Sequence, residues 1–285
     1  MANNSFIKKS WVLWTLTIIF TLFIAYLQRT TGPTYPVSGK VNVGKEVIKY
    51  KLIRTDEITG TTIDSEIPIS APENISGTYI YKRYKSNDVW TEKQLKRDGD
   101  NLVISIPRQP MAGKVEYQVV LTDGEQIIKL PAEPVIMRFK GVVPKLTVLL
   151  PHVLMMILAM IFSTRTGLEA IVKGEKTYKL AVWTLIFLGI GGMILGPIMQ
   201  KYAFDAYWTG WPFGHDLTDN KTIISFIFWI AAVIMLYKDR TKRIIAIVAA
   251  VVLIGIYSIP HSALGSELDY TKIEGEKTEI PAEEG

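Results

Sequence analysis

Hydrophobic residues collect in five runs along the chain, and each run is almost free of charged side chains. The runs cover residues 11–27, 146–162, 180–199, 223–237 and 244–259. An α-helix rises about 1.5 Å per residue, so about 20 residues cross a hydrocarbon core of roughly 30 Å, or slightly fewer when polar ends reach the surface. The pattern predicts five transmembrane helices, and the fourth run fits this length least well.

Between residues 34 and 142 the hydrophobic period changes to two, which is typical of strands with one buried face. Alternation is clearest in the stretches 48–52, 79–84, 102–106, 115–121, 127–130 and 135–139. Asp123-Gly124 separates two of them and predicts a hairpin, because a tight type I′ turn needs positive φ at both central residues. Six or seven short strands in this length predict an all-β, immunoglobulin-like or fibronectin-like sandwich.

The predicted fold class is therefore a mixed membrane protein, in which an N-terminal anchor helix and a four-helix bundle carry an inserted all-β extracytoplasmic domain. The predicted parts are a cytoplasmic N-terminus (1–10), the anchor (11–27), the β-sandwich (34–142), the four-helix domain (146–262) with an aromatic outer loop (200–221), and an acidic extracytoplasmic tail (263–285). Low hydrophobicity and many carboxylates predict that the tail is disordered beyond Tyr270.

The first run also resembles the core of a signal peptide, because Lys8 and Lys9 form a basic flank ahead of it. However, the run is longer than a usual signal core, and Leu27-Gln28-Arg29 offers no small-residue cleavage pattern. We therefore expect an uncleaved anchor.

Basic residues in the short connections predict the orientation, because Lys and Arg are retained on the cytoplasmic side. They precede the first run and follow the second and fourth runs: Lys8, Lys9, Arg165, Lys173, Lys176, Lys179, Lys238, Arg240, Lys242 and Arg243. All fit a multi-pass protein of the cytoplasmic (inner) membrane with the N-terminus inside and the β domain and C-terminus outside. The net charge of +5 then reflects orientation, and we expect no nucleic-acid partner.

The three histidines are the most informative candidates for chemistry. The predicted topology puts His152, His215 and His261 near the outer membrane face, where a compact bundle would let them converge. Imidazole ligates zinc, copper or iron and costs less to bury than a permanent charge. We expect a metal site of these histidines with Asp216, although each histidine also has a structural interpretation, as a hydrogen-bond partner or an interfacial anchor. Haem b, copper and zinc all remain open as cofactors.

Three further residues are candidates for cofactor binding. Met156 lies one helical turn after His152, and a thioether beside an imidazole suits copper(I) or haem iron, although methionine more often fills packing gaps. Trp208 and Trp211 belong to the aromatic loop. In composition and in its flanking His215, this loop is loosely similar to the tryptophan-rich outer loops of haem-handling proteins in cytochrome c maturation, without their motif. An aromatic belt at the membrane interface is the alternative.

Asp216 and Asp219 have different expected roles. Asp219 or Thr218 is placed to cap the helix that follows the loop, whereas Asp216 is placed to orient His215 or to join a metal shell. Several glycines between residues 189 and 196 predict that the third predicted helix approaches its neighbours closely.

Absent residue types narrow the function further. The chain has no cysteine, which excludes thiolate chemistry and cysteine-ligated iron–sulfur clusters. No Asp, Glu, Lys or Arg lies within the five predicted helix cores, so ion-coupled transport is the class we favour least. The leading hypothesis is a membrane protein with a histidine-ligated metal or haem site, acting in electron transfer or cofactor assembly. The alternative is a non-catalytic scaffold whose outer β domain docks a membrane or extracytoplasmic partner protein; metal-assisted hydrolysis ranks below both.

Overall fold

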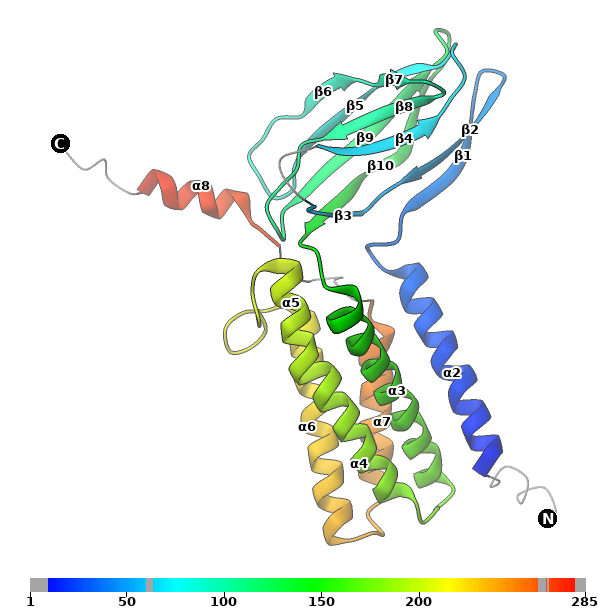
Figure 1. Ribbon diagram of the computed structural model, residues 1–285, viewed down its shortest axis with the longest axis vertical. Helices are drawn as coiled ribbons and strands as arrows, with labels where there is room; N and C mark the ends of the chain where they lie inside the picture. The colour runs from blue at the N-terminus through cyan, green and yellow to red at the C-terminus, as the bar shows by residue number, and fades with distance from the viewer. Residues whose placement is uncertain (1–9, 60–63, 261–264, 266, 280–285) are drawn as a thin grey trace. The chain divides into compact units, whose positions relative to one another are not determined.

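Contacts within the chain divide it into two compact units (Figure 1). The computed structural model describes residues 10–59, 64–260, 265 and 267–279. One unit, here the helical unit, comprises Met1–Pro33 and Val143–Gly265. The other, here the β unit, comprises Thr34–Val142 and Ser266–Gly285. The end of the chain is thus grouped with the strands, although it follows the last apolar helix.

The helical unit contains four helices that are long and apolar enough to cross a membrane. The first is α2 (Ser10–Thr31) and the last is α6 (Leu217–Lys238). The second, Lys145–Ile171, consists of η1 (Lys145–Leu149) followed by α3 (Leu150–Ile171). The third, Thr177–Phe204, consists of α4 (Thr177–Leu188), η2 (Gly189–Leu195) and α5 (Gly196–Phe204). A shorter apolar helix, α7 (Ile244–Ser258), has 15 residues. At 1.5 Å per residue α7 is roughly 22 Å long, short of a hydrocarbon core. It is the fifth predicted span, and not the fourth, that fits least well.

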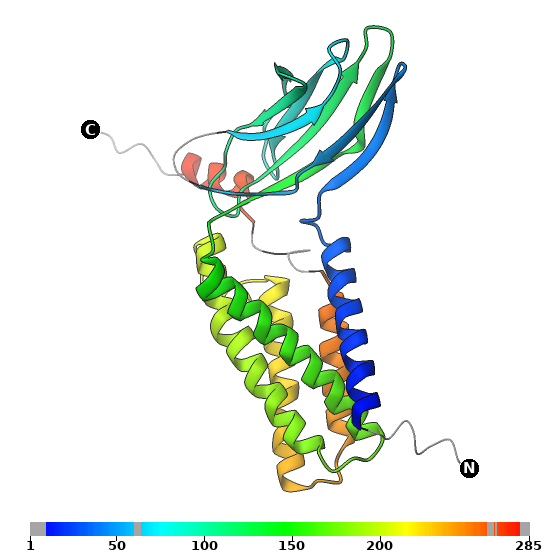
Figure 2. The same ribbon diagram turned by 45° about the vertical axis from the view of Figure 1, so that its right-hand side comes forward.

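Small residues allow the helices to pack closely. Helix α3 contacts α4 and α7, and α6 closes the ring by contacting both α4 and α7. Helix α2 lies against α3 and α7, and the two views agree on this arrangement (Figure 2). Trp229 is fully buried and belongs to one hydrophobic cluster with the buried alanines Ala159, Ala181, Ala232, Ala246, Ala249 and Ala250. Glycine spacing in η2 predicted close approach, and this is confirmed: a Cβ on Gly192 would lie 2.8 Å from Thr222 of α6.

The helices extend beyond the apolar runs, and their extra turns carry charges. Helix α3 continues to Ile171, so Arg165, which the orientation count placed in a connection, lies buried inside the helix with Glu169. Helix α6 begins at Leu217 and therefore includes Lys221, which is also buried. The five apolar runs contain no charged residue, as predicted, but the complete helices do.

The β unit has ten strands within the described residues, arranged in three sheets. The five-stranded sheet has the order β3 (Thr55–Glu57), β10 (Ile127–Lys140), β9 (Lys114–Thr122), β5 (Ser76–Arg83), β6 (Thr91–Gln94). The three-stranded sheet has the order β4 (Ser65–Ser70), β8 (Asn101–Ile106), β7 (Lys96–Asp98), and β1 (Val37–Val43) pairs with β2 (Glu46–Leu52). One hydrophobic core, which includes Ile48, Ile69, Ile104, Tyr117 and Phe139, is shared by all three sheets.

Each stretch of alternation in the sequence lies within a strand or overlaps one, with two differences. The stretches 127–130 and 135–139 form the single strand β10, whose pairing with β9 shifts between Leu130 and Val135. The turn at Asp123 is longer than predicted: Thr122 pairs with Ile127, and the Asp123 carboxylate accepts hydrogen bonds from the backbone of Glu125 and Gln126. The immunoglobulin-like topology stays a prediction.

The prediction of disorder beyond Tyr270 is wrong for residues 271–279, which are helical. Residues Tyr270–Glu279 form helix α8. Because Ser266–Gly285 groups with the β unit, we refer to residues 267–279 as the C-terminal segment. The carboxylates of Glu267 and Glu274 form ion pairs with basic side chains of the β unit.

Candidate functional site

The two histidines of the predicted site that the structure describes lie in different surroundings. His152 is half-buried on α3, and its Nδ1 lies 2.9 Å from the backbone oxygen of Gly191 in η2. His215 is exposed in the loop before α6, and His261 lies outside the described residues. Among the residues that the structure describes, no group of three His, Asp or Glu side chains could hold a metal ion. The three-histidine site therefore stays a prediction.

Asp216 has a structural role of its own. It is the N-cap of α6, and its carboxylate accepts hydrogen bonds from the backbone amides of Thr218 at 2.7 Å and Asp219 at 3.3 Å. The prediction that Asp219 or Thr218 is the cap is wrong. Asp219 instead accepts hydrogen bonds from the amides of Thr209 and Gly210 in the preceding loop, at 2.7 and 2.9 Å. The sequence predicted an oxygen-bearing cap before this helix but placed it two or three residues too late, because the helix starts earlier than the apolar run.

The remaining candidates take part in local packing. The indole nitrogen of Trp208 donates to the backbone oxygen of Trp211 at 3.0 Å, and the Trp211 ring is exposed. Met156 packs against η2, where a Cβ on Gly191 would lie 2.8 Å from its sulfur. Met156 therefore explains the glycine opposite it, in keeping with the gap-filling alternative, and its role in cofactor binding stays a prediction.

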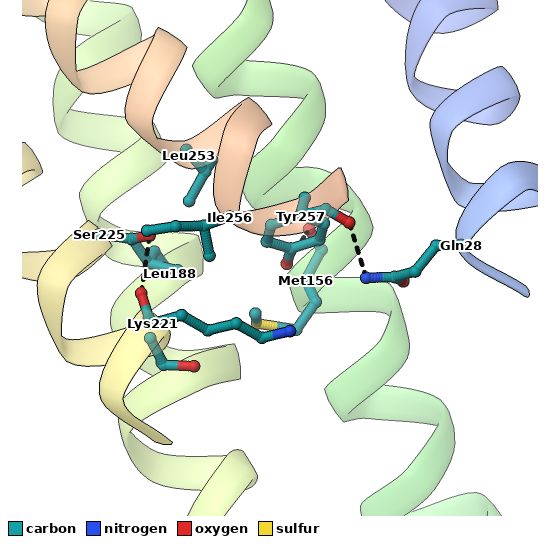
Figure 3. A pocket seen from close by; sticks show the side chains of 9 residues that line it. Gln28, Met156, Leu188, Lys221, Ser225, Leu253, Ile256 and Tyr257 are labelled. Atoms are coloured by element: carbon teal, nitrogen blue, oxygen red, sulfur yellow. Dashed lines mark hydrogen bonds between the residues drawn. The ribbon is translucent and has the colours of Figure 1, made fainter. Parts of the chain in front are cut away.

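A polar cluster that the sequence did not predict lies at the C-terminal end of α7 (Figure 3). The side chain of Gln28, from α2, donates to the backbone oxygen of Tyr257 at 2.9 Å. The amine of Lys221, from α6, donates to the backbone oxygen of Ile259 at 3.0 Å. The last carbonyls of a helix have no partner within the helix, and leaving them unpaired in an apolar setting is costly. The two side chains thus complete the end of the short helix α7.

A small cavity adjoins this cluster. Its lining mixes apolar with polar side chains: Gln28, Met156, Leu188, Lys221, Thr222, Ser225, Leu253, Ile256 and Tyr257. The lysine stem crosses it beside Met156, as Figure 3 shows. The free space of about 10 Å³ matches one water molecule and is too small for a cofactor.

Near the C-terminal end of α3, a buried ion pair joins Arg165 and Glu169, 2.7 Å apart. The guanidinium also lies 5.4 Å from the ring centroid of Trp14 in α2. Glu169 accepts a hydrogen bond from the backbone of Lys176 at 3.2 Å, and a Cβ on Gly174 would collide with its carboxylate. The pair therefore ties α2 and the start of α4 to α3.

The β unit carries a second cluster, which we call the basic patch: Arg83, Lys85 and Lys114. Arg83 ends β5, Lys85 follows it in a turn, and Lys114 begins the neighbouring strand β9. Strand pairing of β5 with β9 brings the three cations together, because Arg83 pairs with Val115. Like charges at this spacing repel one another, so the patch is stabilised by a negatively charged partner.

The C-terminal segment supplies that partner. Glu267 forms ion pairs with both Lys85 and Lys114. Arg83 forms ion pairs with Asp88, at 2.6 Å, and with Glu274, at 2.5 Å. The contact with Lys114 is the most sheltered from solvent, whereas the Arg83 pairs are about one-third exposed and contribute little.

Tyr270 anchors the segment between these charged contacts. It is 6% exposed, its hydroxyl donates to Gln109 at 3.0 Å, and the Arg83 guanidinium lies 4.6 Å from its ring centroid. Gly113 must lack a side chain, because a Cβ there would lie 2.7 Å from the tyrosine oxygen. Backbone hydrogen bonds from Leu268 to Ala112 and from Thr271 to Lys85 fix the segment on either side.

The same contacts shift the pKa values of Glu267, Lys114 and Lys85. Burial alone would raise the pKa of Glu267, but hydrogen bonds from Lys114 and Lys85 bring it below its usual value. Burial lowers the pKa of Lys114, and its contact with Glu267 offsets only part of that effect. The hydrogen bond with Glu267 raises the pKa of the more exposed Lys85. Glu267 is thus held as a carboxylate at neutral pH.

Neither Lys221 nor the basic patch was found from the sequence. Lys221 lies two residues before the apolar run 223–237 and was counted as loop; recognising Asp216 as the N-cap would have placed it inside the helix. The patch joins residues about 30 and 150–190 positions apart, and no short motif connects them. In the sequence, only the opposite charges of the acidic tail and of the strand region indicated that the two could pair.

Comparison with known proteins gives no family for this chain: no protein-family model matches it, and neither does any curated protein or any solved structure.

Proposed function

We propose that this protein is a membrane-anchored docking subunit, in which the basic patch of the β unit binds an acidic, tyrosine-containing segment. The proposal includes five spans with α7 as the fifth, the N-terminus on the cytoplasmic side, and an immunoglobulin-like β unit outside the membrane. Four apolar helices support the membrane setting. The basic residues at one end of the predicted spans support the orientation.

One observation carries the proposal: the patch already holds a ligand of this chemistry, the C-terminal segment of the chain itself. The segment is not a strand of any sheet, and it contacts the β unit through one buried ring, two backbone hydrogen bonds and paired charges. This combination is how many domains recognise a short peptide, with a pocketed side chain for affinity and charges for specificity.

Magnitudes favour Tyr270 as the anchor. Removing a buried aromatic side chain costs roughly 3–5 kcal/mol, whereas an exposed ion pair contributes at most about 1 kcal/mol. Glu267, shared between two lysines, then fixes the direction of the segment. A partner segment with a carboxylate three residues before a tyrosine would satisfy the same groups.

The test uses the full-length protein in lipid nanodiscs. A vacated variant, Glu267→Ala with Tyr270→Ala, frees the patch from the chain's own segment. We expect a labelled peptide of residues 267–279 to bind the vacated variant and to bind the unaltered protein far more weakly. Adding Lys85→Glu to the vacated variant should weaken binding by about tenfold, which corresponds to 1.4 kcal/mol.

A double-mutant cycle separates recognition from misfolding. A peptide carrying Glu267→Gln should bind the vacated variant and its Lys85→Glu derivative with similar affinity, because the carboxylate that Lys85 recognises is then absent. Absence of peptide binding to the folded vacated variant would sink the docking proposal, since the patch would then serve only its own segment.

A histidine-ligated metal or haem site, acting in electron transfer or cofactor assembly, is the second candidate function. It is favoured by the hydrogen-bonding distance between His152 Nδ1 and the Gly191 oxygen. Donation from Nδ1 would leave Nε2 as the free ligand atom, which is the usual arrangement of metal-binding histidine. The π-helical segment η2 supplies that carbonyl, and such segments are frequent at functional sites.

This second candidate is tested by absorption spectra and elemental analysis of detergent-purified protein from cells supplied with haem and metals. A Soret band or near-stoichiometric metal that disappears in a His152→Ala, His261→Ala variant would support it. A colourless, metal-free protein would exclude it.

A further inference from the structure

The loop between α5 and α6 has an inverted distribution of polar and apolar groups. Asp216 at the end of the loop and Asp219 in the first turn of α6 are buried, whereas Tyr207, Trp211 and Phe213 in the loop are exposed. Residues 206–214 contain no charged side chain. In Figure 1 this connection extends sideways from the helices beside α5. A loop that faces water normally shows the opposite pattern.

Hydrogen bonds hold the loop in one shape. The Asp219 carboxylate accepts from the amides of Thr209 and Gly210, and the Asn220 side chain accepts from the amide of Trp211 at 2.6 Å. The amides of Phe213 and Gly214 both donate to the oxygen of Gly210 at 2.9 Å. The exposed rings are thus presented by a braced backbone and are not the result of a loop without partners.

Two glycines are required for this bracing. A Cβ on Gly210 would lie 2.5 Å from that of Asp219, and a Cβ on Gly214 would lie 2.3 Å from the oxygen of Thr209. Together with the buried carboxylates, they show that the first turn of α6 organises the loop. The exposed aromatic tip, residues 211–213, is the part this organisation leaves uncovered.

The flanking helices also expose apolar side chains. Tyr202 on α5 and Ile224 on α6 are exposed, as are Ile194 and Ile227 further along these spans. Both spans are long and apolar enough to cross a membrane. Aromatic rings favour the headgroup zone at the edge of that region, where one side is apolar and the other is hydrated.

We infer that the aromatic tip, Trp211 to Phe213, is a lipid-binding element that inserts into the interfacial zone of the bilayer beside α5 and α6. The loop fastens the end of the helical unit at a fixed depth, and Asp219 and Asn220 position the rings for this contact. The occupant is the boundary between headgroups and acyl chains, not a partner protein or a cofactor.

The chain has no cysteine, so single-cysteine variants provide a direct test in the full-length protein. Phe213→Cys and Val89→Cys are a matched pair, because the two side chains are 82% and 84% exposed and Val89 belongs to the β unit. Phe23→Cys, exposed on α2, serves as the deep lipid reference. Each is spin-labelled, reconstituted in phosphatidylcholine nanodiscs, and tested for collision with oxygen and with a water-soluble nickel complex.

The expected oxygen-to-nickel ratio at position 213 is several-fold above that at position 89 and below that at position 23. Asp219→Asn should reduce the difference while the fold is retained, because a neutral amide accepts more weakly from the loop amides. A label at 213 that is as accessible to nickel as the label at 89 would overturn the inference, as would one accessible to neither reagent, which would indicate contact with protein.

Discussion

The β unit and the helical unit distribute their side chains in opposite ways. In the β unit, Ile69, Ile104 and Phe139 are buried, and among its described charged side chains only Lys114 and Arg138 are. In the helical unit, large apolar residues such as Ile19 and Phe23 are exposed, whereas Ser163, Thr166 and Arg165 are buried. Both follow from the hydrophobic effect, because the surface of each unit suits its own surroundings.

Two ion pairs within the helical unit make the consequence of burial measurable. Arg165–Glu169 and Lys201–Asp205 are both spaced i,i+4, with distances of 2.7 and 2.6 Å. Their side chains are 1% and 9% exposed in the first pair and 41% and 71% exposed in the second. Breaking the buried pair should therefore lower the unfolding free energy more than breaking the exposed pair, because water cannot reach a buried charge to replace its lost partner.

The largest predicted effect is on the buried pair. Replacing Arg165 with Met leaves Glu169 buried without its cation, and we expect a loss of roughly 3–5 kcal/mol in unfolding free energy. Thermal unfolding in detergent micelles measures it. The matched control, Lys201→Met, should leave the melting temperature almost unchanged; equal shifts for the two variants would contradict the account.

The next effect concerns the β unit. Tyr270→Ala should weaken docking of the C-terminal segment by roughly 3 kcal/mol through loss of its buried ring. Tyr270→Phe, which loses only the bond to Gln109, should cost about 1 kcal/mol. Amide hydrogen exchange of residues 267–279 reports both. The exposed neighbour Lys272→Ala is the control, and similar exchange in all three variants would argue against Tyr270 as the anchor.

A smaller effect is expected at the end of α7. Gln28→Leu removes the donor to the Tyr257 oxygen and should cost about 1–3 kcal/mol, because that carbonyl then lacks its partner in an apolar setting. Faster exchange confined to the last turn of α7 would reveal it. Thr30→Val provides the comparison, because it removes a hydroxyl two residues further along α2 that donates to the backbone of its own helix. Equal exchange in the two variants would show that Gln28 does not cap α7.

The smallest effect is on pH dependence. Because the pKa of Glu267 is lowered in the docked state, its contribution is complete above its unfolded value, about 4.3, and is lost as the pH falls through the lower docked value. A dye on Lys272→Cys should report release of the segment on acidification. Glu267→Gln should flatten this profile, and a profile unchanged by that variant would assign the titration elsewhere.

Much of the secondary structure followed from the sequence, because hydrophobic period is a local property. The five apolar runs lie within helices, and the alternating stretches fall in strands. Strand β4 was not predicted; it contains Pro68, which occupies an exposed position at the edge of its sheet, where a missing donor costs nothing. Helix ends were misplaced where polar residues such as Lys221 continue the helix beyond its apolar run.

The site was harder to predict because it depends on pairing across the sheet. Lys114 meets Glu267 only after β5 and β9 pair and the chain end folds back, and no local pattern encodes that encounter. His152 was rightly placed on an apolar helix, but its partner is a backbone carbonyl of η2, which side-chain types do not reveal.

The most direct test of the docking proposal is whether the patch exchanges its ligand. In full-length protein in nanodiscs, hydrogen exchange of residues 267–279 is followed as free peptide of the same sequence is added. An intramolecular segment acts at an effective concentration on the order of millimolar, so peptide in that range must compete. The account predicts that the chain's own segment becomes deprotected while the basic patch stays protected. Protection of the segment that is independent of peptide concentration would show it to be a permanent part of the fold and would contradict docking at this site.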